Sequence, residues 1–310
     1  MSNKKYLRYT WFVVFWVFFV ILAGGIVRMT QSGMGCPDWP TCFGRWIPPT
    51  SKSQLPDNYK EKYMTKQDID PEFNVYHTWT EWLNRMVGAV LGVLVFIHLI
   101  WSWRKYRKTD RSIVWISLLL LLATGFQGWL GKKVVDHNLA AVKVTTHMIV
   151  ALLIAALPLL IIYKLKAATR IKNNFLKWFS MLVLVLVVVQ VAFGTQVREQ
   201  VDEYSKPLKY LNRDTWMDFI QMQRDFLAHR SFSWIVAAAC LILCIKAWRY
   251  DPLRTHALFI TLLVVLTILI GVTMAWYDIP ALAQCAHLFI ASILTLSVFS
   301  FILRVQGSKE

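Results

Sequence analysis

Charged residues are scarce in this chain of 310 residues: Asp, Glu, Lys and Arg make up 17% of it, whereas hydrophobic residues make up 56%. Stretches such as Trp11 to Val27 carry no charge at all, and the mean hydropathy of the chain is +0.45. A soluble domain does not need uncharged runs of this length. The composition therefore excludes a soluble globular protein and indicates an integral membrane protein with several spans.

A basic domain is also missing, although 34 Lys and Arg stand against 18 Asp and Glu. The basic residues lie in short clusters between apolar spans, which is how a membrane protein is oriented. Nucleic acid is therefore not expected as a partner, and the net charge of +16 indicates topology and contact with anionic membrane lipid instead.

Eight apolar spans are long enough to cross about 30 Å of hydrocarbon at about 1.5 Å per residue. A cleaved signal peptide at the first span is the alternative there, but the repeat described below gives that span a counterpart within the chain. The fold class predicted is an all-α polytopic membrane protein. Its spans are expected near residues 10–28, 80–103, 112–131, 142–164, 177–197, 225–246, 256–276 and 281–303.

Orientation follows from the charge of the connections. The N-terminus, the connections near 104–111, 164–177 and 246–255, and the C-terminus hold 18 Lys and Arg against three acidic residues; the other side holds 16 basic and 15 acidic residues. Because the positive side is cytoplasmic, both termini are predicted inside a bacterial-type inner membrane or an equivalent energy-transducing membrane. The long connections 29–79 and 199–224 then lie outside, and loops of this length are usually functional.

The two halves of the chain share residues at equal spacings in one order. This predicts a parallel repeat of two four-helix bundles, residues 1–170 and 171–310. The correspondences are Gly24–Arg28 with Gly194–Arg198, Leu83-Asn84-Arg85 with Ala228-His229-Arg230, and Gly131–His147 with Gly271–His287.

Three of the seven histidines, His147, His229 and His287, lie a turn or two inside even-numbered spans at matching depths. An ionisable side chain within a span is a functional candidate, and two histidines on facing helices suit a porphyrin iron. The second half offers His229 with His287; the first offers His147 facing Asn84. Proton relays or simple hydrogen bonds are the alternative. His137 and His256 are interpreted as solvated, and His98 as buried and hydrogen-bonded.

Four arginines, Arg28, Arg85, Arg198 and Arg230, recur in register. Their guanidinium groups could hold porphyrin propionates through bidentate contacts. The alternative is that they snorkel to the membrane interface.

Cys36 and Cys42 lie in the first outer connection with five residues between them. That side is oxidising, so a disulfide is expected, either as a structural staple or as a thiol pair that exchanges electrons with a partner. Connection 199–224 holds no second pair. The remaining cysteines lie within spans and are expected to pack as small apolar residues: Cys240, Cys244 and Cys285.

Glu81 begins the second span, three residues before Asn84 and on the same helical face. Its counterpart in the second half is Phe226, so the carboxylate makes the first half chemically distinct. A helix-entry acid favoured by the helix dipole is the alternative.

The segment GGIVRMTQSGMGCPDWPTCFGRWIPP, Gly24 to Pro49, closely resembles the first-span and first-loop signature of haem A synthases, membrane enzymes of cytochrome oxidase assembly. The resemblance extends over most of the chain. It implies that the C-terminal half holds haem b and that the N-terminal half binds haem O. It also implies oxidation of the C8 methyl of haem O to a formyl group, through successive hydroxylations and loss of water, to give haem A.

By this resemblance His229 and His287 are the haem b axial ligands, and His147 is a ligand of the substrate haem. Glu81 is the catalytic carboxylate, and Cys36 and Cys42 are the outer-loop redox pair. The chain departs from the family in three respects. Asn84 stands where a histidine is common, the cysteines are one residue closer, and a second cysteine pair is absent.

These departures predict that His147 is the principal protein ligand of the substrate haem and that its opposite face is open or water-bound. His77 lies seven residues before Asn84, about 10 Å along a helix, and would replace it only if the segment before Glu81 folded back. A farnesyltransferase that produces haem O is the expected partner; the sequence identifies no electron donor and leaves a homo-oligomer open. The alternative functions are a bis-haem electron carrier of the quinone or cytochrome b type and a membrane thiol-disulfide oxidoreductase.

Overall fold

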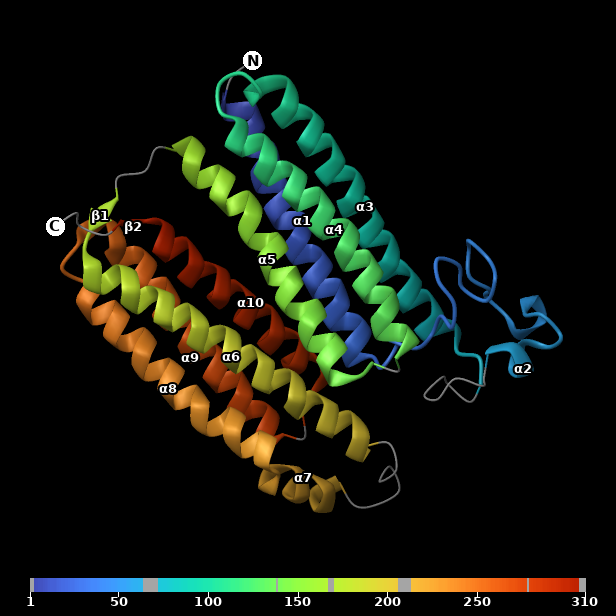
Figure 1. Ribbon diagram of the computed structural model, residues 1–310. Coiled ribbons are helices and arrows are strands. Elements are labelled where there is room, and N and C mark those ends of the chain that lie inside the picture. Colours follow the sequence, from blue (N-terminus) through green and yellow to red (C-terminus); the bar gives the residue numbers. More distant parts are fainter. Residues whose placement is uncertain are drawn as a thin grey trace. The chain divides into compact units, whose positions relative to one another are not determined.

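The computed structural model describes residues 3–63, 72–137, 139–166, 170–205, 213–277 and 279–306 (Figure 1). Nearly all regular structure in these residues is helical. The helices are α1 (Asn3–Met29), α2 (Tyr59–Tyr63), α3 (Val75–Tyr106), α4 (Arg111–Asp136), α5 (Ala141–Lys166), α6 (Asn174–Ser205), α7 (Arg213–Met222), α8 (Arg224–Ala247), α9 (Asp251–Trp276) and α10 (Ala281–Leu303), with a 3₁₀ turn η1 (Lys52–Gln54). Strands β1 (Ile171–Lys172) and β2 (Val305–Gln306) pair in parallel.

Eight helices within the described residues are long and apolar enough to cross a membrane: α1, α3, α4, α5, α6, α8, α9 and α10. The eight predicted spans and the all-α fold class are therefore confirmed, and most of the helices extend a few residues beyond the predicted ends. The chain is a multi-pass membrane protein.

The chain divides into two compact units, residues 1–161 and 162–310. The sequence places the division after residue 170, at the boundary between its two proposed repeats. That the units are repeats of each other stays a prediction, and each is described separately below.

The N-terminal unit is organised around α3. Asn74 caps this helix, because its side-chain oxygen accepts hydrogen bonds from the backbone N–H groups of Tyr76 and His77 at 3.0 and 3.3 Å. Helices α1 and α4 both pack on α3. Between α1 and α3, His98 Nε2 lies 3.2 Å from the hydroxyl of Thr10, and neither residue is exposed. The prediction that His98 is buried and hydrogen-bonded is confirmed.

The long helices of the C-terminal unit close a ring in which α6 contacts α8, α8 contacts α9, α9 contacts α10 and α10 contacts α6. Small and branched side chains fill this bundle, and Cys240 and Cys244 are among them, as predicted. Cys285 is buried as well. The β1–β2 pair joins the residues before α6 to those after α10.

The prediction for His256 was wrong. This histidine is half-buried, and its Nε2 lies 2.8 Å from the carbonyl oxygen of Ser297 on α10. Helix α9 already begins at Asp251, so His256 is part of the span and not of the loop. His137 is exposed at the end of α4, as predicted, and its Nδ1 lies 2.9 Å from the carbonyl of Lys133.

Candidate functional site

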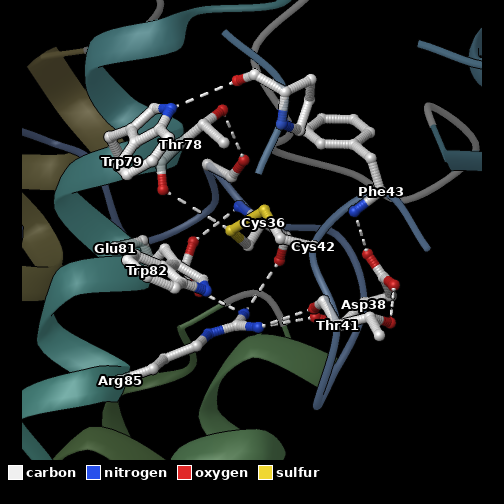
Figure 2. The surroundings of a disulfide bond; sticks show 12 residues. Cys36, Asp38, Thr41, Cys42, Phe43, Thr78, Trp79, Glu81, Trp82 and Arg85 are labelled. Atoms are coloured by element: carbon white, nitrogen blue, oxygen red, sulfur yellow. Dashed lines mark hydrogen bonds and ion pairs between the residues drawn. A yellow bond between two sulfur atoms is a disulfide. The ribbon is translucent and has the colours of Figure 1, made fainter. Parts of the chain in front are cut away.

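Cys36 and Cys42 form the predicted disulfide in the Cys loop, defined here as residues 30–63 (Figure 2). Their Cα atoms are 4.9 Å apart, and neither residue is exposed. The side chains of Phe43 and Tyr63 pack around them. Exchange with a partner's thiol needs access to a sulfur atom, so full burial favours the structural interpretation of this disulfide.

Gly35 allows the Cys loop to approach α3 closely. The hydroxyl of Thr78 donates to the carbonyl oxygen of Gly35 at 3.0 Å. A Cβ atom on Gly35 would lie 2.5 Å from the carbonyl carbon and oxygen of His77, which is closer than any side chain tolerates. Only glycine therefore lets Cys36 lie against the first turns of α3.

Glu81 is buried in α3 directly beneath the disulfide, with 4% of its surface exposed (Figure 2). Its Oε2 accepts a hydrogen bond from the backbone N–H of Cys36 at 2.7 Å, and its Oε1 lies 2.5 Å from Nη2 of Arg85, one helical turn away. A buried carboxylate needs both a compensating charge and hydrogen bonds. Glu81 has both, and one of them comes from the Cys loop itself.

Arg85 joins α3 to the backbone of the segment that the disulfide closes. Its Nη1 donates to the carbonyl oxygens of Asp38 and Thr41 at 2.7 and 3.1 Å, and its Nη2 donates to that of Cys36 at 3.1 Å. With the ion pair to Glu81, these bonds employ all four Nη hydrogens. A propionate at Arg85 would have to bind at Nε or displace one of these acceptors, and this predicted role stays a prediction.

Asp38 is a site residue that the sequence analysis missed. Its carboxylate accepts hydrogen bonds from the backbone N–H groups of Phe43 and Gly44 at 2.6 and 2.9 Å and from the hydroxyl of Thr41. These bonds fold the loop back on itself around Cys42. The signal was an Asp among Pro, Thr and Gly residues, because Asp readily bonds nearby backbone groups in such turns.

Each of the three candidate haem-ligand histidines lies against a glycine of a neighbouring helix. A Cβ atom would lie 3.5 Å from Cε1 of His147 if built on Gly131, and 3.4 Å from Cε1 of His287 if built on Gly271. For His229 the glycine is Gly194, at 3.2 Å. The sequence showed two of these pairs only as equal spacings; the structure shows that the glycines make room for the imidazole rings.

Two glutamines that the sequence analysis passed over fix the same helices. Gln127 Nε2 donates to the carbonyl oxygen of His147 at 2.9 Å, and Gln190 Nε2 donates to that of His229 at 3.0 Å. Gln190 Nε2 also lies 3.2 Å from Nδ1 of His229. Each glutamine precedes its glycine by four residues, and an amide within an apolar span was the available signal.

The rings of His229 and His287 have centroids 6.3 Å apart, with planes inclined at 63°. Two imidazoles on one metal, with bonds of about 2 Å and ring radii of about 1.1 Å, have centroids about 6 Å apart. The separation therefore fits one metal between the two rings. Nδ1 of His229 lies 3.2 Å from Nε2 of Gln190, so Nε2 is the nitrogen of this ring that could serve as an axial ligand of a porphyrin iron.

Asn84 breaks this pattern in the N-terminal unit. Its side-chain oxygen is buried without a hydrogen-bond partner in the described part of the chain, and so is Nδ1 of His147. A Cβ atom on Gly24, the repeat counterpart of Gly194, would meet nothing within 4 Å. Because α3 is helical from Val75 onward, the segment before Glu81 does not fold back. His77 therefore stays about 10 Å from Asn84 along the helix axis.

The propionate-binding roles of the other three arginines also stay predictions. Arg28 lies in the last turn of α1, Arg198 lies in α6, and Arg230 is exposed next to His229 in α8. Within the described residues no group of three or more His, Cys, Asp or Glu gathers as a metal site. A porphyrin supplies four nitrogens of its own, so a pair of histidines suffices for a haem iron.

A family model described as cytochrome oxidase assembly protein matches residues 7–299 of the chain. The heme A synthase of Shewanella oneidensis is 23% identical to it over 90% of both chains. The heme A synthase of Neorickettsia sennetsu is 26% identical over 93% of this chain and 95% of its own length. The heme A synthase of Orientia tsutsugamushi is 24% identical over 94% and 93%, respectively.

Proposed function

The chain belongs to the family of cytochrome oxidase assembly proteins, and we propose that it is a haem A synthase, an oxidoreductase that converts the C8 methyl of haem O to the formyl group of haem A. The proposal rests on one asymmetry. The C-terminal unit holds two facing imidazoles, whereas the N-terminal unit holds one imidazole, an amide and the carboxylate of Glu81.

His229 and His287 would hold haem b in the C-terminal unit. When bound there, haem b supplies one-electron transfer to the oxidation of the substrate. The glycines Gly194 and Gly271 leave room for the two rings, and Gln190 holds the backbone of His229.

His147 would bind the iron of haem O in the N-terminal unit. The opposite face would be left to Asn84, whose amide is a poor iron ligand but has a buried oxygen that can accept a hydrogen bond from water. The open space at Gly24 supports this assignment, because no second imidazole fills it.

Glu81 lies one turn from Asn84 on the same helix and is proposed as the general acid–base group. Its carboxylate would assist the loss of water from the doubly hydroxylated carbon: it would take the proton of one hydroxyl group while the other leaves as water, which gives the formyl group. Arg85 and the N–H of Cys36 hold both carboxylate oxygens in place, so Glu81 acts from a fixed position. The disulfide would serve by fixing the Cys loop that provides this N–H.

The partners and orientation are likewise proposed. Haem O would come from a farnesyltransferase in the same membrane, both termini would lie in the cytoplasm, and the Cys loop would lie outside. No described contact favours either alternative function. A bis-haem carrier needs a second histidine where Asn84 stands, and a thiol-disulfide oxidoreductase needs an accessible sulfur, whereas Cys36 and Cys42 are both buried.

Extraction and chromatography of the haems from purified protein test the function. Haem B together with haem O, haem A or a hydroxylated intermediate is the expected result. Haem B alone, in two equivalents per chain, would contradict the synthase and favour the electron carrier.

A further inference from the structure

Two large apolar side chains of the Cys loop stand out from the protein. Trp46 is 73% exposed and Ile47 is 67% exposed. They do not belong to a loose tip, because Cys42 and Arg45 form an antiparallel bridge with N–H···O bonds of 2.9 and 3.2 Å. The two residues between them, Phe43 and Gly44, have positive φ angles of 54° and 75°, which is the tight-turn geometry of a β-hairpin. Trp46 and Ile47 are therefore joined rigidly to the disulfide.

The segment that follows the bridge lies along the side of α3. The indole N–H of Trp82 donates to the carbonyl oxygen of Trp46 at 3.0 Å, and that of Trp79 donates to the carbonyl oxygen of Pro49 at 3.3 Å. Figure 2 shows both indoles on the helix face next to the Cys loop. The level of Trp46 along the membrane normal is thus fixed by the level of Trp82.

That level can be counted from the other end of α3, where Arg104 and Lys105 mark one membrane surface. About 30 Å of hydrocarbon takes about 20 residues at 1.5 Å each, which leads back to Asn84. Trp82 lies about 3 Å beyond this point, within a headgroup layer about 5–7 Å thick on each side. This count agrees with the exposed apolar side chains along α3, which recur from Leu83, 52% exposed, to Trp103, 54% exposed.

We propose that Trp46 and Ile47 form a membrane anchor that inserts into the lipid headgroup layer beside α3. Removing an apolar side chain of this size from water is favourable, and tryptophan favours this layer because its ring is apolar while its N–H stays hydrated. The occupant is lipid and not a protein, because the two side chains lie level with the hydrocarbon boundary and next to the tryptophans of a membrane span. The anchor holds the Cys loop, and with it the disulfide, against α3.

This inference is independent of the proposed function, and a depth measurement tests it. The fluorophore NBD is attached to Trp46→Cys, and separately to Ile47→Cys, in the full chain carrying Cys240→Ala, Cys244→Ala and Cys285→Ala. The protein is placed in phosphatidylcholine nanodiscs without reductant, so that the disulfide stays closed. Asn58→Cys, an exposed polar position before α2, is the matched control. Quenching by lipids brominated on the acyl chains is compared with quenching by iodide in the water.

Brominated lipid should quench the label at positions 46 and 47 but not at 58, and the iodide quenching constant should be at least about threefold lower at 46 than at 58. Equal iodide quenching at all three positions would place the loop in water and overturn the proposal. Protection from both quenchers at 46 and 47 would also overturn it, because a second copy or another protein would then cover these residues.

Discussion

The two units carry different side chains at the positions that the proposed repeat pairs. In the C-terminal unit the rings of His229 and His287 lie with their centroids 6.3 Å apart and their planes inclined at 63°. In the N-terminal unit His147 keeps its glycine neighbour, Gly131, but the position expected to face it holds Asn84. A Cβ atom on Gly24, the proposed counterpart of Gly194, would meet nothing within 4 Å. Two strong ligands leave an iron no site for reaction, whereas one leaves a face open. The first arrangement suits electron transfer and the second suits chemistry.

The residues around the two candidate sites also differ between the units. Arg85 is tied to Glu81, to the Cys loop and to the disulfide region, while its counterpart Arg230 is exposed on α8. Glu81 itself is replaced by Phe226 in the second half. Among the described residues, a buried carboxylate paired with an arginine and a loop closed by a disulfide therefore occur together in the N-terminal unit.

Removing either imidazole of the complete pair should have the most severe effect. His229→Ala or His287→Ala should abolish the low-spin haem b spectrum and with it formyl production, because the iron loses one of the two strong axial ligands that keep it low-spin. The spectrum of purified, membrane-inserted protein provides the measurement. His137→Ala, at an exposed position, is the control and should keep the spectrum; retention of the bis-histidine signal in both test variants would refute the assignment.

Glu81→Gln should lower formyl production by about 10²–10⁴-fold, the range typical for loss of a general acid–base group. Haem content should be unchanged, because no histidine is altered. Haem chromatography after a timed incubation measures both. Glu72→Gln removes an exposed carboxylate near the Cys loop that pairs with Lys52, and it should leave activity intact. Equal losses in the two variants would show that Glu81 has no special role.

Asn84→His should make the two units alike. A second imidazole in the N-terminal unit would close the open face of the substrate haem, so we expect a second low-spin signal and at least about a tenfold loss of formyl production. EPR on protein loaded with substrate haem, together with product analysis, provides the readout. Higher activity in this variant would mean that ligation by two histidines favours the reaction, contrary to the role given to Asn84.

The glycines should show a smaller difference, which thermal unfolding and haem b content can detect. Alanine is about 1 kcal/mol better than glycine within a helix. Gly24→Ala should gain this stability, because its Cβ meets nothing within 4 Å, whereas in Gly194→Ala the Cβ would lie 3.2 Å from the ring of His229. We therefore expect a higher Tm only for Gly24→Ala and a reduced haem b content only for Gly194→Ala. Identical Tm and haem b content in the two variants would show that the space next to Gly194 is not needed by the ring of His229.

Several features could be predicted from sequence because their signals are local or repeated. The spans follow from apolar length, and the disulfide follows from two cysteines on an oxidising side with a short segment between them. Cys36 and Cys42 are confirmed as a pair. The error at His256 had a local cause too, since α9 begins five residues earlier than the apolar run suggested.

Other features could not be predicted, because they depend on how the Cys loop folds against α3. Arg85 bonds to carbonyl oxygens 44, 47 and 49 residues away in sequence, and nothing in its neighbourhood indicates those partners. Snorkelling and propionate binding were the local interpretations. The contact of Gly35 with His77 is equally non-local.

Resonance Raman or EPR spectroscopy of protein loaded with substrate haem tests the difference between the two sites most directly. We expect a low-spin signal from haem b and, beside it, a high-spin or water-ligated component. His147→Ala should alter that component and His77→Ala should leave it unchanged. A bis-histidine signal from the substrate site that disappears in His77→Ala would contradict the open face and the rigid placement of His77 on α3.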